Sequence, residues 1–201
     1  MTVDESASSA IANGDTGELG EAPGSLRLIE EFVNSVDLPD GEDHLGTADS
    51  ARRWLASKGV DATLDESARA ALVALREAFR DLLEGNGGHE VSPEAVALVM
   101  HQLNDTRLAV VITEEGAHAH PAPEETGVDD FYGRLAAAMI TASVYGTWQR
   151  LKVCRNDECR FAFYDKSKNA RRQWCSMATC GCREKARNYR ARKKSPVDAT
   201  G

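Results

Sequence analysis

The sequence predicts a mainly α-helical (α+β) fold: a helical N-terminal domain with one β-hairpin, followed by a small cysteine-rich module. Apolar residues recur at helical spacing through most of the first 150 residues, and strand chemistry appears there only at RLAVVIT. All five cysteines lie between Cys154 and Cys182. A chain of 201 residues with 42% apolar residues can bury one ordinary core and a small second unit, which excludes wholesale disorder.

The distribution of charge divides the chain into two parts. The formal net charge is -8, yet residues 1–149 hold 9 basic and 27 acidic residues, whereas residues 150–194 hold 15 basic and 4 acidic ones. A positive stripe attracts phosphate whatever charge lies elsewhere on the molecule, so we expect two modules with different partners. The predicted organisation is a disordered tail, a helical domain, a cysteine-rich module and a second disordered tail, over residues 1–24, 25–149, 150–194 and 195–201.

The first half of the helical domain contains three predicted helices. Apolar spacing indicates a helix from residue 25 to about residue 37 and a short one over residues 47–58. Thr63 and Glu66 have the spacing of a capping box, which predicts a long helix that ends at Gly85.

The second half of this domain begins with Ser92-Pro93-Glu94, a cap, a proline and an acid that together predict another helix. RLAVVIT and AHAHPA, joined through Glu115-Gly116, then form the one predicted hairpin. An Ala-rich helix follows over residues 131–145, and its apolar face is a candidate seam for a homodimer.

Four cysteines have the spacing of a structural zinc site. Cys154 and Cys159 are separated by four residues, Cys175 and Cys180 by four, and the two pairs by fifteen. Two short knuckles across a hairpin-length spacer offer tetrahedral Zn²⁺ four thiolates, and four protein ligands leave no open position for catalytic water. Within the spacer, RFAFYD predicts one strand, DKSKNA a turn and RRQW the returning strand.

The fifth cysteine, Cys182, leaves three alternatives open. It can displace Cys180 as the fourth ligand, ligate nothing, or act as a redox-reactive neighbour of the metal site. We favour a small spare thiol in the first turn of a helix, because four ligands are already present without it.

A basic helix is predicted after the last cysteines, where CREKARNYRARKK runs without proline or glycine. Most charge runs are solvated faces, but here one sign dominates and a zinc knuckle anchors the helix, so we favour nucleic-acid contact. Tyr189 can stack on a base or pack on the knuckle. The candidate contact residues are Arg183, Arg187, Arg190 and Lys194 on one face, Lys185, Arg192 and Lys193 beside them, and Arg171 and Arg172 on the returning strand.

Two other groups of polar residues are weaker candidates. Asn34 and Asp37 can bind a small ligand, or can simply end the first helix and begin a turn, which is the role we favour. His118 and His120 share one face of a predicted strand, and a solvent-facing pair is favoured over a metal site because no third ligand is near in the sequence.

Several classes of protein are excluded by what the sequence lacks. No Gly-rich phosphate loop, Ser-His-Asp arrangement or H-E-x-x-H motif is present, so we expect no enzyme activity. The longest apolar runs, such as residues 108–112, are far shorter than the roughly 20 residues of a membrane helix, and MTVDESASS is no signal peptide. We therefore expect a cytoplasmic protein without a membrane partner.

The cysteine-rich tail resembles the CGNR zinc finger of bacterial regulators, with C-x4-C, an aromatic strand, DKSKNARRQWCSMATCGCR and a basic stretch. The tetrad reads Cys180-Gly181-Cys182-Arg183, so Cys182 replaces the family's Asn. Upstream, FVNSVD and the later Trp54-Leu55 resemble the ABATE-like domain that accompanies this finger. The resemblance covers residues 25–194. It implies a stress-induced transcriptional regulator in which the finger binds DNA and the larger domain serves sensing or assembly.

The sequence is best interpreted as a DNA-binding transcriptional regulator that holds Zn²⁺ and whose effector is unspecified. Two alternatives share its charge pattern or its thiols. One is an RNA-binding or ribosome-associated zinc protein, and the other is a zinc-thiol redox sensor that depends on Cys182.

Overall fold

A computed structural model describes residues 21–114 and 116–194 and confirms the mainly α-helical fold. The predicted tail over residues 195–201 lies outside the described residues, as do residues 1–20. The helices are α1 Leu26–Val33, α2 Ala48–Ser57, α3 Glu66–Asn86, α4 Pro93–Asn104, α5 Gly127–Val144 and α6 Cys182–Lys194. In the described part of the chain, the strands form three two-stranded antiparallel sheets, β1 Val36–Asp37 with β2 Glu42–Asp43, β3 Leu108–Thr113 with β4 Gly116–Pro121, and β5 Leu151–Val153 with β6 Ala162–Tyr164.

The helix starts follow local capping chemistry. Ser92 caps α4 by accepting from the Ala95 backbone N–H, with Pro93 in the first turn as predicted. At α3 the prediction was wrong by two residues, because the Asp65 side chain, not Thr63, accepts from the Ala68 backbone N–H. A carboxylate at this position also interacts favourably with the positive end of the helix dipole.

The first helix ends earlier than predicted, at Val33 instead of near Asp37. Val36 pairs with Asp43 across a turn in which Gly41 has φ +74°, so the chain forms a short strand pair directly after the helix. The segment between Val33 and this strand pair is thereby free to face the C-terminal module.

An aromatic cluster forms the centre of the main core. Phe32 of α1 contacts Trp54 of α2, Phe79 of α3 and Phe131 of α5, with ring centroids 5.9, 6.1 and 5.2 Å apart. These rings bury large apolar areas and prefer tilted and edge-on contacts of this kind. Ala22 is also buried, and its N–H donates to Glu30, so this residue packs on the body although it lies within the predicted tail.

The strand pair β5–β6 is part of this main core rather than of a separate one. Leu151, Val153, Ala162 and Tyr164 all join the core cluster, with β5 against α3 and β6 against α1. The predicted returning strand RRQW is wrong: β6 pairs with the segment before Cys154, and residues 171–174 form no strand. Residues 171–174 and β5 were both possible partners for β6, and local sequence does not distinguish them. Packing of β5 against α3 favours β5.

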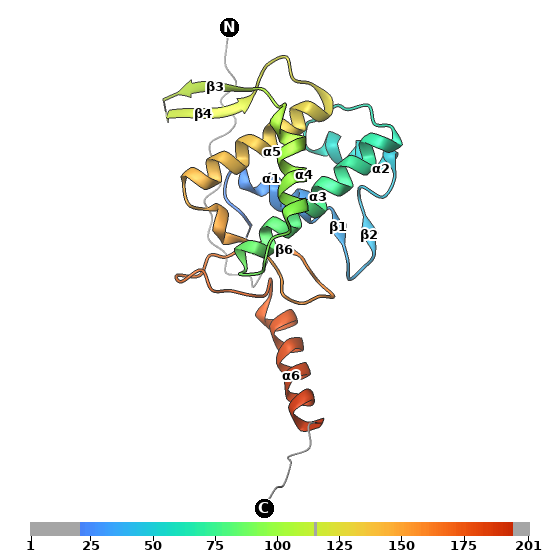
Figure 1. The fold of residues 1–201 in the computed structure, drawn as a ribbon, viewed down its shortest axis with the longest axis vertical. Coiled ribbons are helices and arrows are strands. Elements are labelled where there is room, and N and C mark those ends of the chain that lie inside the picture. Colours follow the sequence, from blue (N-terminus) through green and yellow to red (C-terminus); the bar gives the residue numbers. More distant parts are fainter. Residues whose placement is uncertain (1–20, 115, 195–201) are drawn as a thin grey trace, which may run out of the picture.

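Figure 1 shows α6 projecting from one end of the molecule and the β3–β4 hairpin extending near the other end. Of the elements described, α6 contacts chiefly the π-helical turn Met177–Gly181 that precedes it. No described helix has both the length and the apolar character needed to cross a bilayer.

Candidate metal centre and nucleic-acid interface

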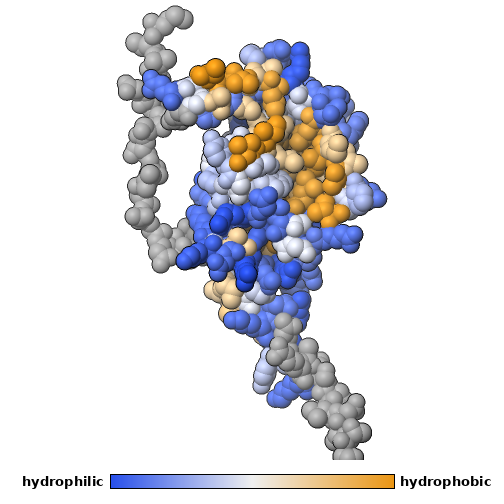
Figure 2. Space-filling model, turned by 60° about the vertical axis from the view of Figure 1, so that its left-hand side comes forward, coloured by the Kyte–Doolittle hydropathy of each residue, from blue (hydrophilic) through white to orange (hydrophobic). Residues whose placement is uncertain are grey.

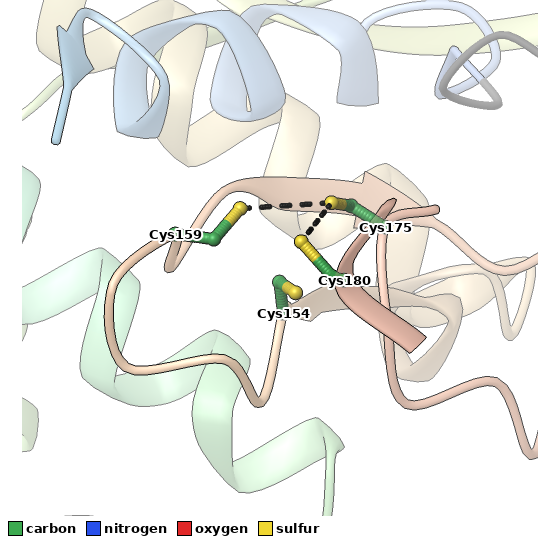
Figure 3. Close-up of side chains that lie close together, drawn as sticks. All are labelled: Cys154, Cys159, Cys175 and Cys180. Atoms are coloured by element: carbon green, nitrogen blue, oxygen red, sulfur yellow. Dashed lines mark hydrogen bonds between the residues drawn. The ribbon is translucent and has the colours of Figure 1, made fainter. Parts of the chain in front are cut away.

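Four buried cysteines converge at the base of α6. Cys154 follows β5, Cys159 precedes β6, Cys175 lies in the loop beyond β6, and Cys180 is in the π-helical turn. Their Sγ atoms all lie within 4.8 Å of one another, and Figure 3 shows the side chains pointing toward a common centre. Among the described residues this is the one group of histidine, cysteine and acidic side chains placed to hold a metal, so His118 and His120 belong to none.

The sulfur positions fit a tetrahedral zinc site. With Zn–S bonds of about 2.3 Å, tetrahedral geometry places neighbouring sulfurs about 3.8 Å apart. The Sγ atoms of Cys159 and Cys175 are 3.6 Å apart, and those of Cys175 and Cys180 are 3.8 Å apart. A disulfide would require about 2.05 Å, so these are free thiols arranged around a metal-sized centre.

The electrostatics of the cluster require a cation before Cys154, Cys159 and Cys175 can all ionise. Hydrogen bonds from Cys159 and Cys175 lower the pKa of Cys154 to about 2. The same contact with Cys154 raises the pKa of Cys159 to about 12 and raises that of Cys175 far above its usual range. One thiolate therefore keeps its neighbours protonated, and a bound dication would release those protons.

Asn156 shapes the first knuckle. Its backbone carbonyl accepts from the N–H groups of Cys159 and Arg160, at 2.8 and 3.0 Å, and its side-chain amide lies 3.6 Å from the Cys180 sulfur. Arg160, at φ 49°, completes the tight turn. Asn156 thus links the two cysteine pairs, and nothing in its sequence context marked it as part of the site.

Arg172 supports the second knuckle and is half-buried. Its guanidinium donates to the backbone carbonyls of Trp174 and Cys175 and lies over the Phe163 ring, 5.4 Å from the centroid. These contacts give Arg172 a structural role. The returning strand on which it was expected to lie is absent, and its contact with nucleic acid stays a prediction. Arg171 is exposed, as its predicted role requires.

A buried ion pair holds the loop between the knuckles. Asp165 is fully buried and accepts from Lys152 Nζ at 3.0 Å, and from the backbone N–H groups of Ser167 and Arg172. Burial by itself would raise the pKa of Asp165, but these hydrogen bonds outweigh it and lower the pKa to about 2. The carboxylate is therefore charged at neutral pH and fixes the path of the chain toward Cys175.

Asn34 joins the N-terminal domain to the metal module. Its amide donates to the Ala162 carbonyl at 2.9 Å and accepts from the Ala162 N–H at 2.7 Å, as a neighbouring strand would. Asp37 instead accepts from the Asp40 N–H in its own turn. Both residues line a cavity of about 770 Å³ between α1 and the knuckles, but Asn34 uses both ends of its amide internally.

Two buried arginines of α3 hold Asn34 in place, and no sequence motif singled them out. Arg80 donates to the Val33 carbonyl, and Arg76 donates to the Ser35 hydroxyl and to Asp43. Both also pair with Glu77 on their own helix. The sequence does contain one sign of their role: both arginines lie on the apolar face of a predicted helix, where a buried charge needs a partner.

The basic side chains of α6 are presented to solvent. Arg183, Lys185, Arg187, Arg190 and Lys193 are exposed, although Arg187 also pairs with Glu184 at 2.6 Å. A groove of about 720 Å³ runs between the first knuckle and this helix, and Asn156, Tyr189 and several of the basic residues line it. The side chains of Arg192 and Lys194 lie outside the described part of the structure.

Cys182 is exposed in the first turn of α6, and it is not one of the four clustered sulfurs. Of its three alternatives, replacement of Cys180 as a ligand therefore does not fit the structure.

Comparison with known families accounts for both parts of the chain. Residues 150–193 match the CGNR zinc finger, and residues 26–145 match ABATE, described as a putative stress-induced transcription regulator. No curated protein matches the chain. Asn34 of the first matched segment bonds Ala162 of the second, and the second segment contains all four clustered cysteines. The chain belongs to the ABATE family and carries a C-terminal CGNR zinc finger.

Proposed function

We propose that this protein is a DNA-binding transcription regulator in which a zinc-anchored helix, α6, contacts the DNA. The observation that carries the proposal is the placement of α6. It starts two residues after Cys180, projects from the body (Figure 1), and presents exposed Arg183, Arg190 and Lys193. A bare helix of this size matches the roughly 12 Å width of the major groove.

The metal would have a structural role. When bound, Zn²⁺ supplies the positive charge that lets four crowded thiols become thiolates and joins the two knuckles. The residues of the chain then set the direction of α6: Asn156 ties the knuckles together, and Arg172 holds the carbonyls beside Cys175. Four protein ligands leave no coordination position for a substrate, which supports a role without catalysis.

The basic surface supports binding to a polyanion. Arginine can fork onto phosphate oxygens or onto a guanine edge, and each neutralised phosphate releases counterions. Tyr189 is 67% exposed beside the groove, where its ring is available to pack on a sugar or a base. The acidic body would repel the same polyanion, so contact is expected at the end of the molecule that carries α6.

The N-terminal domain would sense a signal or mediate assembly. Its cavity of about 770 Å³ reaches Cys159, Cys175, Cys180 and Arg183 from the side of α1. A molecule in this cavity would touch both the domain and the base of α6, which supports a sensing role.

The proposal is tested by fluorescence anisotropy with the zinc-loaded full chain, duplex DNA and structured RNA at several salt concentrations. Arg190→Gln with Lys193→Gln should weaken DNA binding and flatten the log–log salt dependence by about 0.9 for each phosphate that is no longer neutralised. The matched control is Arg52→Gln with Arg53→Gln, two exposed arginines of α2. Equally weakened binding in both variants would contradict the proposal, and tighter binding to RNA at equal salt would favour the RNA-binding alternative.

A further inference from the structure

The β3–β4 hairpin, residues 108–121, forms an arm with exposed apolar side chains. Val110 is 73% exposed and Ile112 is 81% exposed, although both belong to strand β3. Figure 2 shows hydrophobic surface gathered over the upper part of the molecule, the end at which Figure 1 places this hairpin, while the end with α6 is hydrophilic. Two adjacent exposed β-branched residues on one face of a strand indicate a surface that another protein covers.

The hydrogen-bond pattern of the arm shows which backbone groups face its free edge. The Ala122 N–H donates to the Arg107 carbonyl at 2.8 Å, which makes this a hydrogen-bonded pair in the register that pairs Leu108 with Pro121. Because such pairs alternate along an antiparallel ladder, the N–H and C=O groups of Leu108, Val110 and Ile112 point away from β4. Pro121 fits this register, since its missing N–H lies at a position that bonds nothing in β3.

The free edge of β3 lacks the usual features that prevent strand pairing. The strand LAVVIT has no charge and no proline, and its register with β4 runs from Leu108 to Thr113 without a bulge. On the other side, β4 packs against α5. Within the described residues the sheet has two strands, so β3 offers a straight, apolar edge with donors and acceptors available.

We propose that this edge binds the same edge of a second copy, making a two-fold symmetric dimer with a four-stranded sheet. In antiparallel pairing centred on Val110, each Val110 lies opposite its counterpart, and Leu108 lies opposite Ile112. Every outward N–H then meets an outward C=O, as a self-complementary interface requires. The apolar face of the joined sheet carries both copies of Leu108, Val110 and Ile112.

Charge restricts where a second copy can bind. Residues 1–149 carry 9 basic against 27 acidic residues, so two copies repel over most of their surfaces and can meet best where charge is absent. The strand β3 is such a place. A basic partner, in contrast, would find no acidic side chain on this strand to select it.

The area available near the arm suits a modest but specific interface. A standard interface takes about 800 Å² from each partner, more than one strand edge supplies. The helix α5 packs against β4, and its C-terminal end adds Ile140, Val144 and the following Tyr145, which are 50%, 76% and 72% exposed. The Ala-rich helix, only a candidate seam from the sequence, would thus flank the interface, while strand pairing supplies the register.

The dimer would leave both basic helices free. Figure 1 places the arm and α6 toward opposite ends of the long axis of the molecule, so pairing through the arm covers no part of α6. Each dimer then carries two α6 helices on separate sides, and nucleic-acid affinity per chain for a short duplex should not depend on dimerisation. The test of the dimer is therefore independent of the test of DNA binding.

Sedimentation velocity with the zinc-loaded full chain tests the proposal. The wild type should have the mass of a dimer, and Val110→Lys with Ile112→Lys should have the mass of a monomer with an unchanged circular dichroism spectrum, because both positions are exposed. The control Leu38→Lys changes a residue that is 43% exposed in the turn between β1 and β2, and should remain a dimer. A monomeric wild type, or a double-lysine variant that still dimerises, would overturn the proposal.

A crosslink tests the register in a Cys182→Ser background. In a hydrogen-bonded antiparallel pair the Cα atoms are about 5.5 Å apart, which suits a disulfide. Val110→Cys should therefore give a covalent dimer under mild oxidation. The neighbouring Val111→Cys should not, because Val111 lies opposite Ala109 of the second copy and only diagonally from its own counterpart. Equal crosslinking of the two variants, or crosslinking of neither in a protein that sediments as a dimer, would overturn the assigned register.

Discussion

Replacing Asn34 by alanine removes the two hydrogen bonds that join α1 to β6 beside Cys159. Each such bond contributes about 1 kcal/mol, and a buried group left without a partner costs about 1–3 kcal/mol. Ala162 is 1% exposed, which favours the larger cost, but Asn34 and Ala162 also border the cavity of about 770 Å³, from which water can reach them. We therefore expect a decrease of about 2 kcal/mol in the free energy of unfolding, which corresponds to roughly a 30-fold change in the equilibrium constant.

Urea unfolding of the zinc-loaded full chain measures this decrease, and transfer of zinc to a chelator measures its effect on the site. Asn34→Ala should unfold at lower urea and release zinc faster, because β6 is no longer held beside Cys159. Asn34→Asp should be destabilised as much, since a carboxylate cannot donate to the Ala162 carbonyl. Asn104→Ala, an exposed asparagine at the end of α4, is the control. If Asn34→Ala and Asn104→Ala agree within about 0.5 kcal/mol, the link between domain and site is refuted.

Three further substitutions test the metal module. Asp165→Asn should cost about 3 kcal/mol at pH 7, because Lys152 is left buried without its charged partner. The lowered pKa of about 2 stabilises the wild type above the unfolded value near 4, and this stabilisation is lost as pH falls toward 2. A variant whose urea midpoint has the same acid dependence as that of the wild type would contradict this account. Cys175→Ala should eliminate the one zinc expected per chain in metal analysis and weaken DNA binding with it; full affinity without zinc would separate the two properties. Cys182→Ser should leave zinc content and peroxide-driven zinc release unchanged, because this thiol lies outside the four-sulfur cluster; slower release would support the redox-sensor alternative.

The local elements were largely predictable because their signals are local. Ser92 and Pro93 start α4 as expected, and the hairpin of RLAVVIT with AHAHPA forms where β-branched residues meet a turn. The errors at helix ends also have local causes. Asp65, two residues after Thr63, provides the N-cap of α3. The helix α1 ends at Val33 because the chain then forms the strand pair β1–β2.

The metal ligands and the helix that follows them could be predicted from residue spacing. Four residues separate Cys154 from Cys159, and four separate Cys175 from Cys180. Segments this short cannot hold the two sulfurs far apart, so spacing alone brings each pair together. The basic face of α6 follows equally from helical periodicity.

The attachment of the module to the body became visible only in three dimensions. Asn34 and Ala162 are 128 residues apart, and Arg80 meets Val33 from another helix, so no spacing rule connects them. The partner of β6 and the inward turn of Arg172 likewise depend on packing against α3 and on the second knuckle. Short-range geometry fixes which atoms can share a metal, whereas contacts between distant segments exist only once the core around Phe32 has closed.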